Sequence, residues 1–413
     1  MRSKSLVEFQ YRCTECVKQY DRDQVRYLCP VCGDKYSFGT PLRGVLSVLF
    51  DYDQISRLFN VQKPDWNLFS AVERECYPAF PVGNTPFLKA ERLGDELGFS
   101  NIWIKNEGVN PTGSLKDRAS YTIVAEANRL GEDRIVAAST GNAASSLAAV
   151  AAATGKQAVI FVPENAPQAK LVQMIVHGAC VIPVRGTYDD AFGISIEFTK
   201  EFGGLNRNTA YHPLTIEGKK YAGLEIWQQN QFRVPDFIFV PVGDGVIISG
   251  IYKAFYDLKQ SRLIDRLPRL VCVQAESSDA IHRYITTGDY QPARQPHTIA
   301  DSISVSVPSN VYMAAKAVQD TGGFSVTVSD EEIIEGMNIL ARYAGIFAEP
   351  AAATPLAALR KIRDAGMVKE NEQVVLLVTG HGLKDIPAAL KHVKIPKAVS
   401  PNLSDVIEMV ERF

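Results

Sequence analysis

The chain has 413 residues and a mass of 45.4 kDa, more than one hydrophobic core usually serves, so we expect two or more packed units. An apolar fraction of 46% and a charged fraction of 22% exclude a disordered, collagen-like or coiled-coil chain. The 44 basic and 46 acidic side chains nearly cancel, which excludes the broad positive field of a non-specific nucleic-acid or membrane-surface binder.

The sequence also indicates a compartment. No stretch reaches the ~20 consecutive apolar residues that cross a bilayer, and the amino terminus lacks the pattern of a signal peptide. Seven cysteines, four of them in one short segment, differ from the even count of a secreted disulfide framework. We therefore expect a cytoplasmic protein.

Two Cys-x-x-Cys pairs lie near the amino terminus, Cys13 with Cys16 and Cys29 with Cys32. Four thiolates at this spacing can surround one Zn²⁺ at about 2.3 Å, as in a zinc ribbon, with residues 18–28 as a hairpin arm. A closed set of four thiolates leaves no position for a substrate, so the zinc would be structural. A ribbon without zinc, or two disulfides, would give the same spacing.

From about residue 44 onward, short β-rich runs alternate with alanine-rich stretches, which predicts an α/β fold with a mostly parallel sheet. We expect strands over 101–105, 134–138, 157–163, 179–184, 237–242, 270–275 and 373–378. We expect helices over 120–130, 143–153 and 251–258, and others that begin at 169 and 188. The sequence contains no internal repeat.

Lys116 stands where turn-forming residues lead into a predicted helix. A lysine amine near a helix amino terminus is disfavoured as ammonium, which lowers its pKa and makes it available for imine chemistry. Position alone fits a solvated surface lysine equally well.

Two further loops each follow a predicted strand and open a helix. Ser139-Thr140-Gly141-Asn142 would aim hydroxyls and backbone N–H groups at one point, which suits a carboxylate, although a well-capped helix has the same pattern. The segment Gly243–Gly250 is a candidate phosphate cradle, because glycines let amides approach an anion at a helix amino terminus. It has neither a Walker ending nor a dinucleotide fingerprint. We expect the three strand-ended loops to converge at the carboxyl edge of one sheet.

These motifs together resemble one family. The matching segments, read in order, are Gly83-Asn84-Thr85-Pro86, 110–118, 139–142, Glu349-Pro350-Ala351 and 378–385. They are similar to threonine synthases, which are fold-type II pyridoxal-phosphate enzymes with a tryptophan synthase β-like architecture of two α/β domains. The resemblance implies a zinc-ribbon-like segment over 1–43, a large domain from 44–111 and 208–413, a small domain over 112–207, and a homodimer.

The resemblance also implies roles for residues. Lys116 would bind pyridoxal 5′-phosphate covalently and serve as the catalytic base, Asn142 would hydrogen-bond the 3′-oxygen, and Thr379 would face the pyridine nitrogen. The cofactor phosphate would be held by Gly243, Asp244, Gly245, Val246, Ile247, Ile248 and Ser249. The substrate carboxylate would be received by Ser139, Thr140, Gly141 and Asn142.

The family reaction converts O-phosphohomoserine and water to threonine and phosphate, but several positions depart from the family pattern. The family commonly has threonine at Ala143, asparagine and serine at Thr209 and Ala210, and asparagine at Asp244. Its phosphate-binding arginine is Thr215 here, which removes a contact worth roughly 1.5 to 3 kcal/mol.

Three residues are candidate replacement contacts for the anion: His212, Lys219 and Lys220. The departures leave two other enzymes open, a cysteate-synthase-like enzyme that exchanges the phosphate of O-phosphoserine for sulfite, and a threonine or serine dehydratase. A non-catalytic zinc-ribbon binding protein is a fourth possibility, but the basic residues near the knuckles are offset by acidic ones, and such a protein would be expected to lose Lys116.

Overall fold

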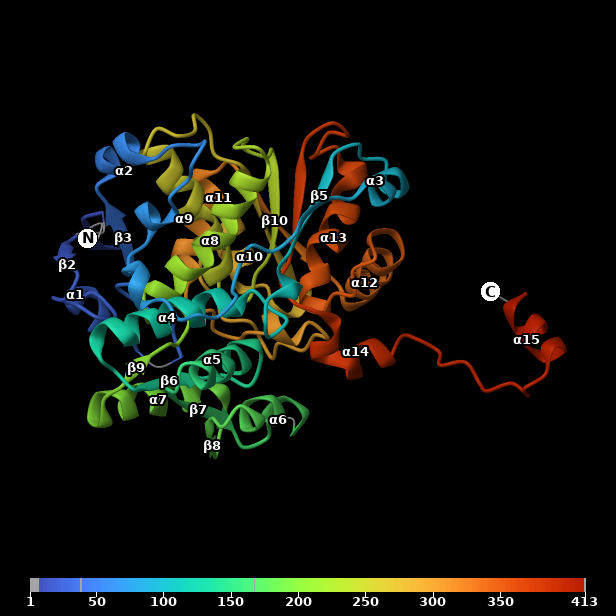
Figure 1. Ribbon diagram of the computed structural model, residues 1–413, viewed down its shortest axis with the longest axis horizontal. Coiled ribbons are helices and arrows are strands. Elements are labelled where there is room, and N and C mark those ends of the chain that lie inside the picture. The colour runs from blue at the N-terminus through green and yellow to red at the C-terminus, as the bar shows by residue number, and fades with distance from the viewer. Residues whose placement is uncertain (1–6, 38, 167, 412–413) are drawn as a thin grey trace.

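The computed structural model describes residues 7–37, 39–166 and 168–411, and Figure 1 shows three sheets with helices around them. The amino-terminal sheet has the order β2 (Gln19–Asp21), β1 (Phe9–Cys13), β3 (Leu46–Phe50), with both pairings antiparallel. The helices α1 (Pro30–Gly33) and α2 (Tyr52–Leu58) flank it. Of the predicted hairpin arm over 18–28, residues 19–21 form β2, which pairs antiparallel with β1, whose other edge pairs with β3.

The six-stranded sheet carries the main core. Its order is β12 (Phe324–Val328), β11 (Arg269–Ala275), β10 (Phe237–Pro241), β13 (Val374–Val378), β5 (Ile102–Asn106), β4 (Phe87–Lys89), and only β4 runs antiparallel to its neighbour. Every residue of β10 and β13 is buried, as expected of parallel strands covered on both faces.

Helices cover both faces of this sheet (Figure 1). The helices of this part of the chain are α3 (Glu91–Leu97), α8 (Leu214–Gln229), α9 (Val246–Gln260), α10 (Ala280–Thr287), α11 (Val311–Asp320), α12 (Asp330–Ala344) and α13 (Pro350–Ile362). Ile238 and Val240 of β10 join α8 and α9 in one hydrophobic cluster, whereas Phe237 and Phe239 join α12 and α13 in another. Successive side chains of β10 therefore point to opposite faces of the sheet and pack against the two layers of helices.

The four-stranded sheet is parallel and has the order β8 (Cys180–Val184), β7 (Gln157–Pro163), β6 (Arg134–Ala138), β9 (Leu205–Asn206). Its helices are α4 (Lys116–Leu130), α5 (Asn142–Ala153), α6 (Gln168–Val176) and α7 (Tyr188–Phe202). The predicted domain limits and the homodimer stay predictions.

The chain ends in two short helices. α14 (Ile386–Leu390) lies on the body, whereas α15 (Leu403–Val410) lies apart from it in Figure 1. None of the helices in the described ranges combines the length and the apolar character that a membrane span needs.

The α/β class is confirmed, and each strand predicted from residue 101 onward exists within about one residue of its expected ends. Two helices begin earlier than predicted: α4 begins at Lys116 instead of 120, and α9 at Val246 instead of 251. The first turns of both helices lie in the motif segments, where turn-forming residues predict a loop instead of a helix.

A buried ion cluster joins the amino-terminal sheet to α8 and α9. The Asp257 carboxylate accepts hydrogen bonds from Tyr52 Oη at 2.8 Å, Lys253 Nζ at 2.5 Å and Lys220 Nζ at 3.0 Å. Lys220 and Lys253 also lie over the Phe50 ring, with Nζ 4.4 Å and 5.0 Å from its centroid.

We predict that Asp257→Ala lowers the free energy of unfolding by about 3–5 kcal/mol, because it leaves two buried ammonium groups with too little compensating charge. Asp53→Ala, which removes the exposed pair with Arg262, is the control and should cost at most about 1 kcal/mol. Urea unfolding followed by circular dichroism measures both, and equal losses would contradict this account of the cluster.

Candidate active site

A cavity of about 560 Å³ lies where the loops after β6 and β10 meet α4, α7 and α8. It is lined by Lys116, Ala138–Ala143, Thr187–Asp189, Arg207, Thr209, Lys219, Pro241–Ile247, Pro296 and Asp301–Val307. The two loops that the sequence singled out do converge at the carboxyl ends of parallel strands. The prediction that they share one sheet is wrong, because β6 belongs to the four-stranded sheet and β10 to the six-stranded sheet.

Lys116 lies at the first position of α4 and faces this cavity. Within the described ranges its ammonium group has no hydrogen-bond or ion-pair partner. Burial, and then the positive charge of Arg207, lower the pKa of Lys116, although Asp244 and Glu349 oppose the shift. The amine is thus held ready to react rather than fixed in a salt bridge.

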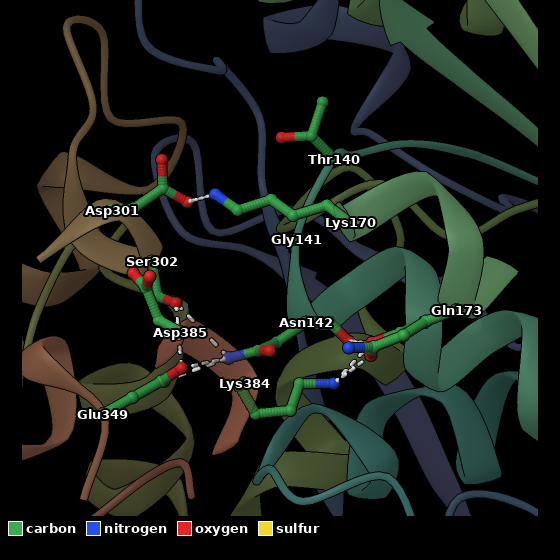
Figure 2. Close-up of a pocket in the computed structure, with 11 residues that line it drawn as sticks. Thr140, Gly141, Asn142, Lys170, Gln173, Asp301, Ser302, Glu349, Lys384 and Asp385 are labelled. Atoms are coloured by element: carbon green, nitrogen blue, oxygen red, sulfur yellow. Dashed lines mark hydrogen bonds and ion pairs between the residues drawn. The ribbon is translucent and has the colours of Figure 1, made fainter. Parts of the chain in front are cut away.

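The segment Ser139–Asn142 forms the turn from β6 into α5, and all four residues line the cavity. The Ser139 hydroxyl accepts a hydrogen bond from Gly141 N at 3.2 Å. Figure 2 shows the Asn142 amide turned towards Glu349, to whose two carboxylate oxygens its Nδ2 donates at 3.0 Å and 2.9 Å. Burial raises the pKa of Glu349. The Asn142 side chain is therefore fixed by a buried acidic group.

The phosphate-cradle loop is built on two glycines that nothing larger could replace. A Cβ on Gly243 would lie 2.9 Å from Ile303 Cα, and one on Gly245 would lie 2.7 Å from the Asn310 carbonyl oxygen. Gly245 also has φ +86° and is the amino-terminal cap of α9, with no side-chain hydrogen bond. The free N–H groups of a fifteen-residue helix thus open onto the cavity, which suits a phosphate.

Two more cations line the cavity without an acidic partner. Arg207 and Lys219 are each 3% exposed, and neither forms an ion pair within the described residues. Arg207 Nε donates to Ser120 Oγ at 3.3 Å, but its buried Nη2 has no partner. Burial lowers the pKa of Arg207 to about 10; burial, followed by the charges of Lys116 and Arg207, lowers the pKa of Lys219 strongly.

Asp244 is the acidic exception in the cradle. Its Oδ1 accepts a hydrogen bond from Ser309 N at 3.1 Å, and its backbone carbonyl accepts one from Asn310 N at 3.0 Å. On its other side, burial and the Asp244 charge raise the pKa of Asp189. The Asp244 carboxylate is thus anchored to the 305–310 loop.

Three of the predicted cofactor residues do not line the cavity: Ile248, Ser249 and Thr379. Ser249 Oγ donates to the Gly245 carbonyl oxygen at 2.8 Å and accepts from Asn310 Nδ2, at the start of α11, at 2.9 Å, so its hydroxyl is already bonded within the protein. The Thr379 carbonyl oxygen accepts from Leu115 N at 2.9 Å, which places Thr379 beside the start of α4.

The structure distinguishes the candidate replacement anion contacts. Lys220 is bound to Glu217, Asp257 and the Phe69 carbonyl oxygen, and His212 is buried, with its pKa lowered to about 3 by burial. Neither lines the cavity, so among the three only Lys219 faces it. Thr215 is fully buried, and its hydroxyl donates to the His212 carbonyl oxygen at 2.9 Å.

Sequence reasoning missed three parts of the site: Arg207, the carboxylate role of Glu349, and the wall formed by residues 301–307. Arg207 follows the two-residue strand β9, which is too short to give a periodic signal. Glu349 lies in the segment Glu349-Pro350-Ala351, which contributes to the family resemblance, but the resemblance implied no role for its carboxylate.

The four amino-terminal cysteines also converge. The ligand atoms of Cys13, Cys16, Cys29 and Cys32 all lie within 4.8 Å of one another, and the Cys16 and Cys29 sulfurs are 3.7 Å apart. A tetrahedron of sulfurs about 2.3 Å from Zn²⁺ has edges of about 3.8 Å, so the donor set fits zinc. None of the seven cysteines forms a disulfide, which contradicts the disulfide alternative.

An unpaired lysine, a polar corner and a helix amino terminus that suits a phosphate lie on one cavity, an arrangement suited to a lysine that reacts with a phosphate-bearing group. The comparisons agree: residues 79–380 match the family of pyridoxal-phosphate dependent enzymes, and the chain belongs to that family. It is a pyridoxal-phosphate-dependent enzyme of the lyase type, similar to threonine synthases.

The chain is 36% identical to threonine synthase of Methanocaldococcus jannaschii, over 92% of this chain and 94% of that relative. It is 34% identical to the Methanosarcina acetivorans threonine synthase, over 97% and 98%. Among solved structures, threonine deaminase isoform 2 of Solanum lycopersicum has a TM-score of 0.64 at 22% identity, over 74% of this chain and 86% of that one. Maize serine racemase has a TM-score of 0.63 at 23% identity, over 75% and 94%. These two structures bear on the fold alone, which is the fold-type II architecture predicted from the sequence.

Because Lys219 is buried without an acidic partner, it should lower the free energy of unfolding of the cofactor-free protein. We predict that Lys219→Met raises the free energy of unfolding by at least about 1 kcal/mol at pH 7. The burial of the Lys219 charge destabilises the wild type fully at pH values below the lowered pKa that Lys219 has in the folded state. This destabilisation shrinks as the pH rises from that pKa to the higher pKa of the unfolded chain. The gain should therefore fall with rising pH. Denaturant titrations at pH 7 and pH 10 measure it, and a pH-independent gain would contradict the ionic origin.

Proposed function

We propose that the enzyme acts on an O-phosphorylated amino acid, with the conversion of O-phosphohomoserine and water to threonine and phosphate as its reaction. The observation that carries this proposal is the pair of buried cations, Arg207 and Lys219, that face the cavity without acidic partners. Uncompensated buried charge is costly unless a ligand neutralises it. The cofactor supplies one phosphate for the cradle, and these cations favour a second anion on the substrate.

The described residues fit the cofactor. Lys116 would bind the aldehyde carbon of the cofactor covalently, and Asn142 would contact the 3′-oxygen on its ring. The loop Gly243–Ile247 would bind the cofactor phosphate through backbone N–H groups. When bound, pyridoxal phosphate withdraws electrons from the α-carbon of an amino acid and so makes its proton removable.

The chain's own residues would do the remaining work. Lys116, with its lowered pKa, would take and return the proton at the α-carbon, because a neutral amine is a base. Ser139 and Thr140 would bind the substrate carboxylate, and the Glu349 carboxylate would orient Asn142 through its Nδ2. Arg207 and Lys219 would bind the departing phosphate and stabilise its charge.

The deciding experiment offers the purified holoenzyme O-phosphohomoserine, O-phosphoserine with sulfite, threonine and serine, and identifies the products by mass. We expect threonine and phosphate from the first alone. Keto acid from free threonine would instead establish a dehydratase, and cysteate from the second would establish sulfite replacement.

We predict that Lys219→Met raises KM for O-phosphohomoserine by about one to two powers of ten, because it removes a charge-assisted contact. Lys219→Arg should retain most of the affinity. Since the wild-type lysine titrates below its usual range, KM should rise at alkaline pH in the wild type and rise less in Lys219→Arg. Steady-state kinetics between pH 7 and pH 10 measure these values. An unchanged KM in Lys219→Met would contradict the role of this residue.

We further propose that Cys13, Cys16, Cys29 and Cys32 hold one structural Zn²⁺. Elemental analysis of the purified chain should find about one zinc per chain, and Cys29→Ser should lose it. Because the cysteines lie in and beside β1 and α1, metal loss should also lower the melting temperature. A zinc-free wild-type protein of unchanged stability would contradict this site.

A further inference from the structure

The amino-terminal segment contacts the loop that carries Arg207. This loop runs from Asn206 in β9 to Pro213 before α8. The Asn206 backbone N–H donates to Tyr27 Oη at 3.0 Å, and the Tyr27 ring stacks on Tyr211 with centroids 4.5 Å apart and planes 19° apart. The same ring meets His212 edge-on at 5.5 Å. Tyr27 therefore touches both ends of the loop.

The loop is held from its opposite side by the four-stranded sheet. Arg207 N donates to the Val136 carbonyl oxygen at 2.8 Å, and Ala138 N donates to Asn208 Oδ1 at 2.7 Å. Arg207 and Thr209, which lie between these anchors and the Tyr27 contacts, line the active-site cavity. The direction of the Arg207 side chain thus depends on a loop clamped between β6 and Tyr27.

A second contact leads from the same segment to the phosphate cradle. Leu42 N donates to the Ser309 carbonyl oxygen at 3.1 Å, and Ser309 N donates to Asp244 Oδ1 at 3.1 Å. A small cavity of about 30 Å³ is lined by Tyr36, Thr40 and Leu42 together with five residues of the active-site cavity: Tyr188, Asp189, Thr209, Asp244 and Val307. Residues of the amino-terminal segment thus form a wall next to the active site.

Other contacts fix the segment to the body away from the cavity. Arg22 pairs with Glu73 at 2.6 Å and with Glu126 of α4 at 3.2 Å. These ion pairs attach the segment without touching the Arg207 loop, so general attachment and loop positioning can be separated by mutation.

We propose that Tyr27 is a positioning residue of the active site, which holds the Asn206–Pro213 loop so that Arg207 faces the cavity. The amino-terminal cysteine segment thereby sets the affinity of the site for the anionic group of the substrate. The identity of that group rests on the proposed function; the docking of the loop does not.

The test compares three holoenzyme variants with the wild type. Tyr27→Ala should raise KM for O-phosphohomoserine about three- to tenfold and leave kcat and the cofactor dissociation constant within about twofold. Tyr27→Phe keeps the stacked ring and should recover most of the affinity. Arg22→Gln, the matched control, breaks an attachment that does not reach the loop and should leave KM unchanged. Zinc content is measured in each variant to ensure that the metal site is intact.

Two readouts do not need turnover. Binding of inorganic phosphate to the holoenzyme, measured by calorimetry, should weaken three- to tenfold in Tyr27→Ala. Hydrogen exchange of the peptide spanning 206–213 should speed up in Tyr27→Ala, while peptides of α5 stay unchanged. If the wild type turns over no phosphorylated amino acid, the proposed function fails, and these two measurements still decide the positioning role. Unchanged phosphate affinity and unchanged exchange in Tyr27→Ala, or equal losses in Arg22→Gln, would overturn it.

Discussion

The site depends on positive charge that the protein buries and does not neutralise. Lys116, Arg207 and Lys219 share one cavity with Asp244, whose carboxylate is anchored by Ser309 N. Elsewhere in the molecule the buried cations are paired: Lys220 and Lys253 have Asp257, and Arg118 has Glu107 and Glu225. Among the described residues, these cations outside the cavity have acidic partners, so the unpaired charge of the cavity is better suited to binding an anionic ligand than to stabilising the fold.

A cluster of paired ions lies next to the unpaired Lys116 and fixes the helix that carries it. Arg118, two residues after Lys116, donates to Glu107 at 2.6 Å and to Glu225 at 2.7 Å. Asn84 N donates to Glu225 Oε1 at 2.8 Å, and Thr85 Oγ1 donates to Glu107 Oε1 at 2.6 Å, so the Gly-Asn-Thr-Pro segment is part of the same network. The start of α4 is thereby fixed relative to α8, and the Lys116 amine is held in place without a bond of its own.

The sequence could predict whatever was encoded locally. Turn formers followed by apolar runs revealed the loops at 110–118, 139–142 and 243–247, and continuous apolar runs revealed the parallel strands. The sequence could not reveal partners distant along the chain, such as Glu349 for Asn142, which are 207 residues apart. Nor could it distinguish Lys219 from its neighbour Lys220, because their difference arises from the packing of α8 against α9. Lys220 meets Asp257 on α9, whereas Lys219 faces the cavity.

The departures from the family pattern become intelligible along α8. Thr215 and Lys219 are four residues apart, so they lie on one face of the helix, one turn from each other. Thr215 turns its hydroxyl back to the Thr209 and His212 carbonyl oxygens, and the positive charge of this face lies at Lys219. A lysine presents a compact charge without the two parallel donors of an arginine. It therefore attracts an anion electrostatically but fixes the orientation of that anion less well than an arginine does. In the function proposed above, Arg207 would supply the planar donor group from the neighbouring loop, so the position of that loop, and its contact with Tyr27, would contribute to substrate selection.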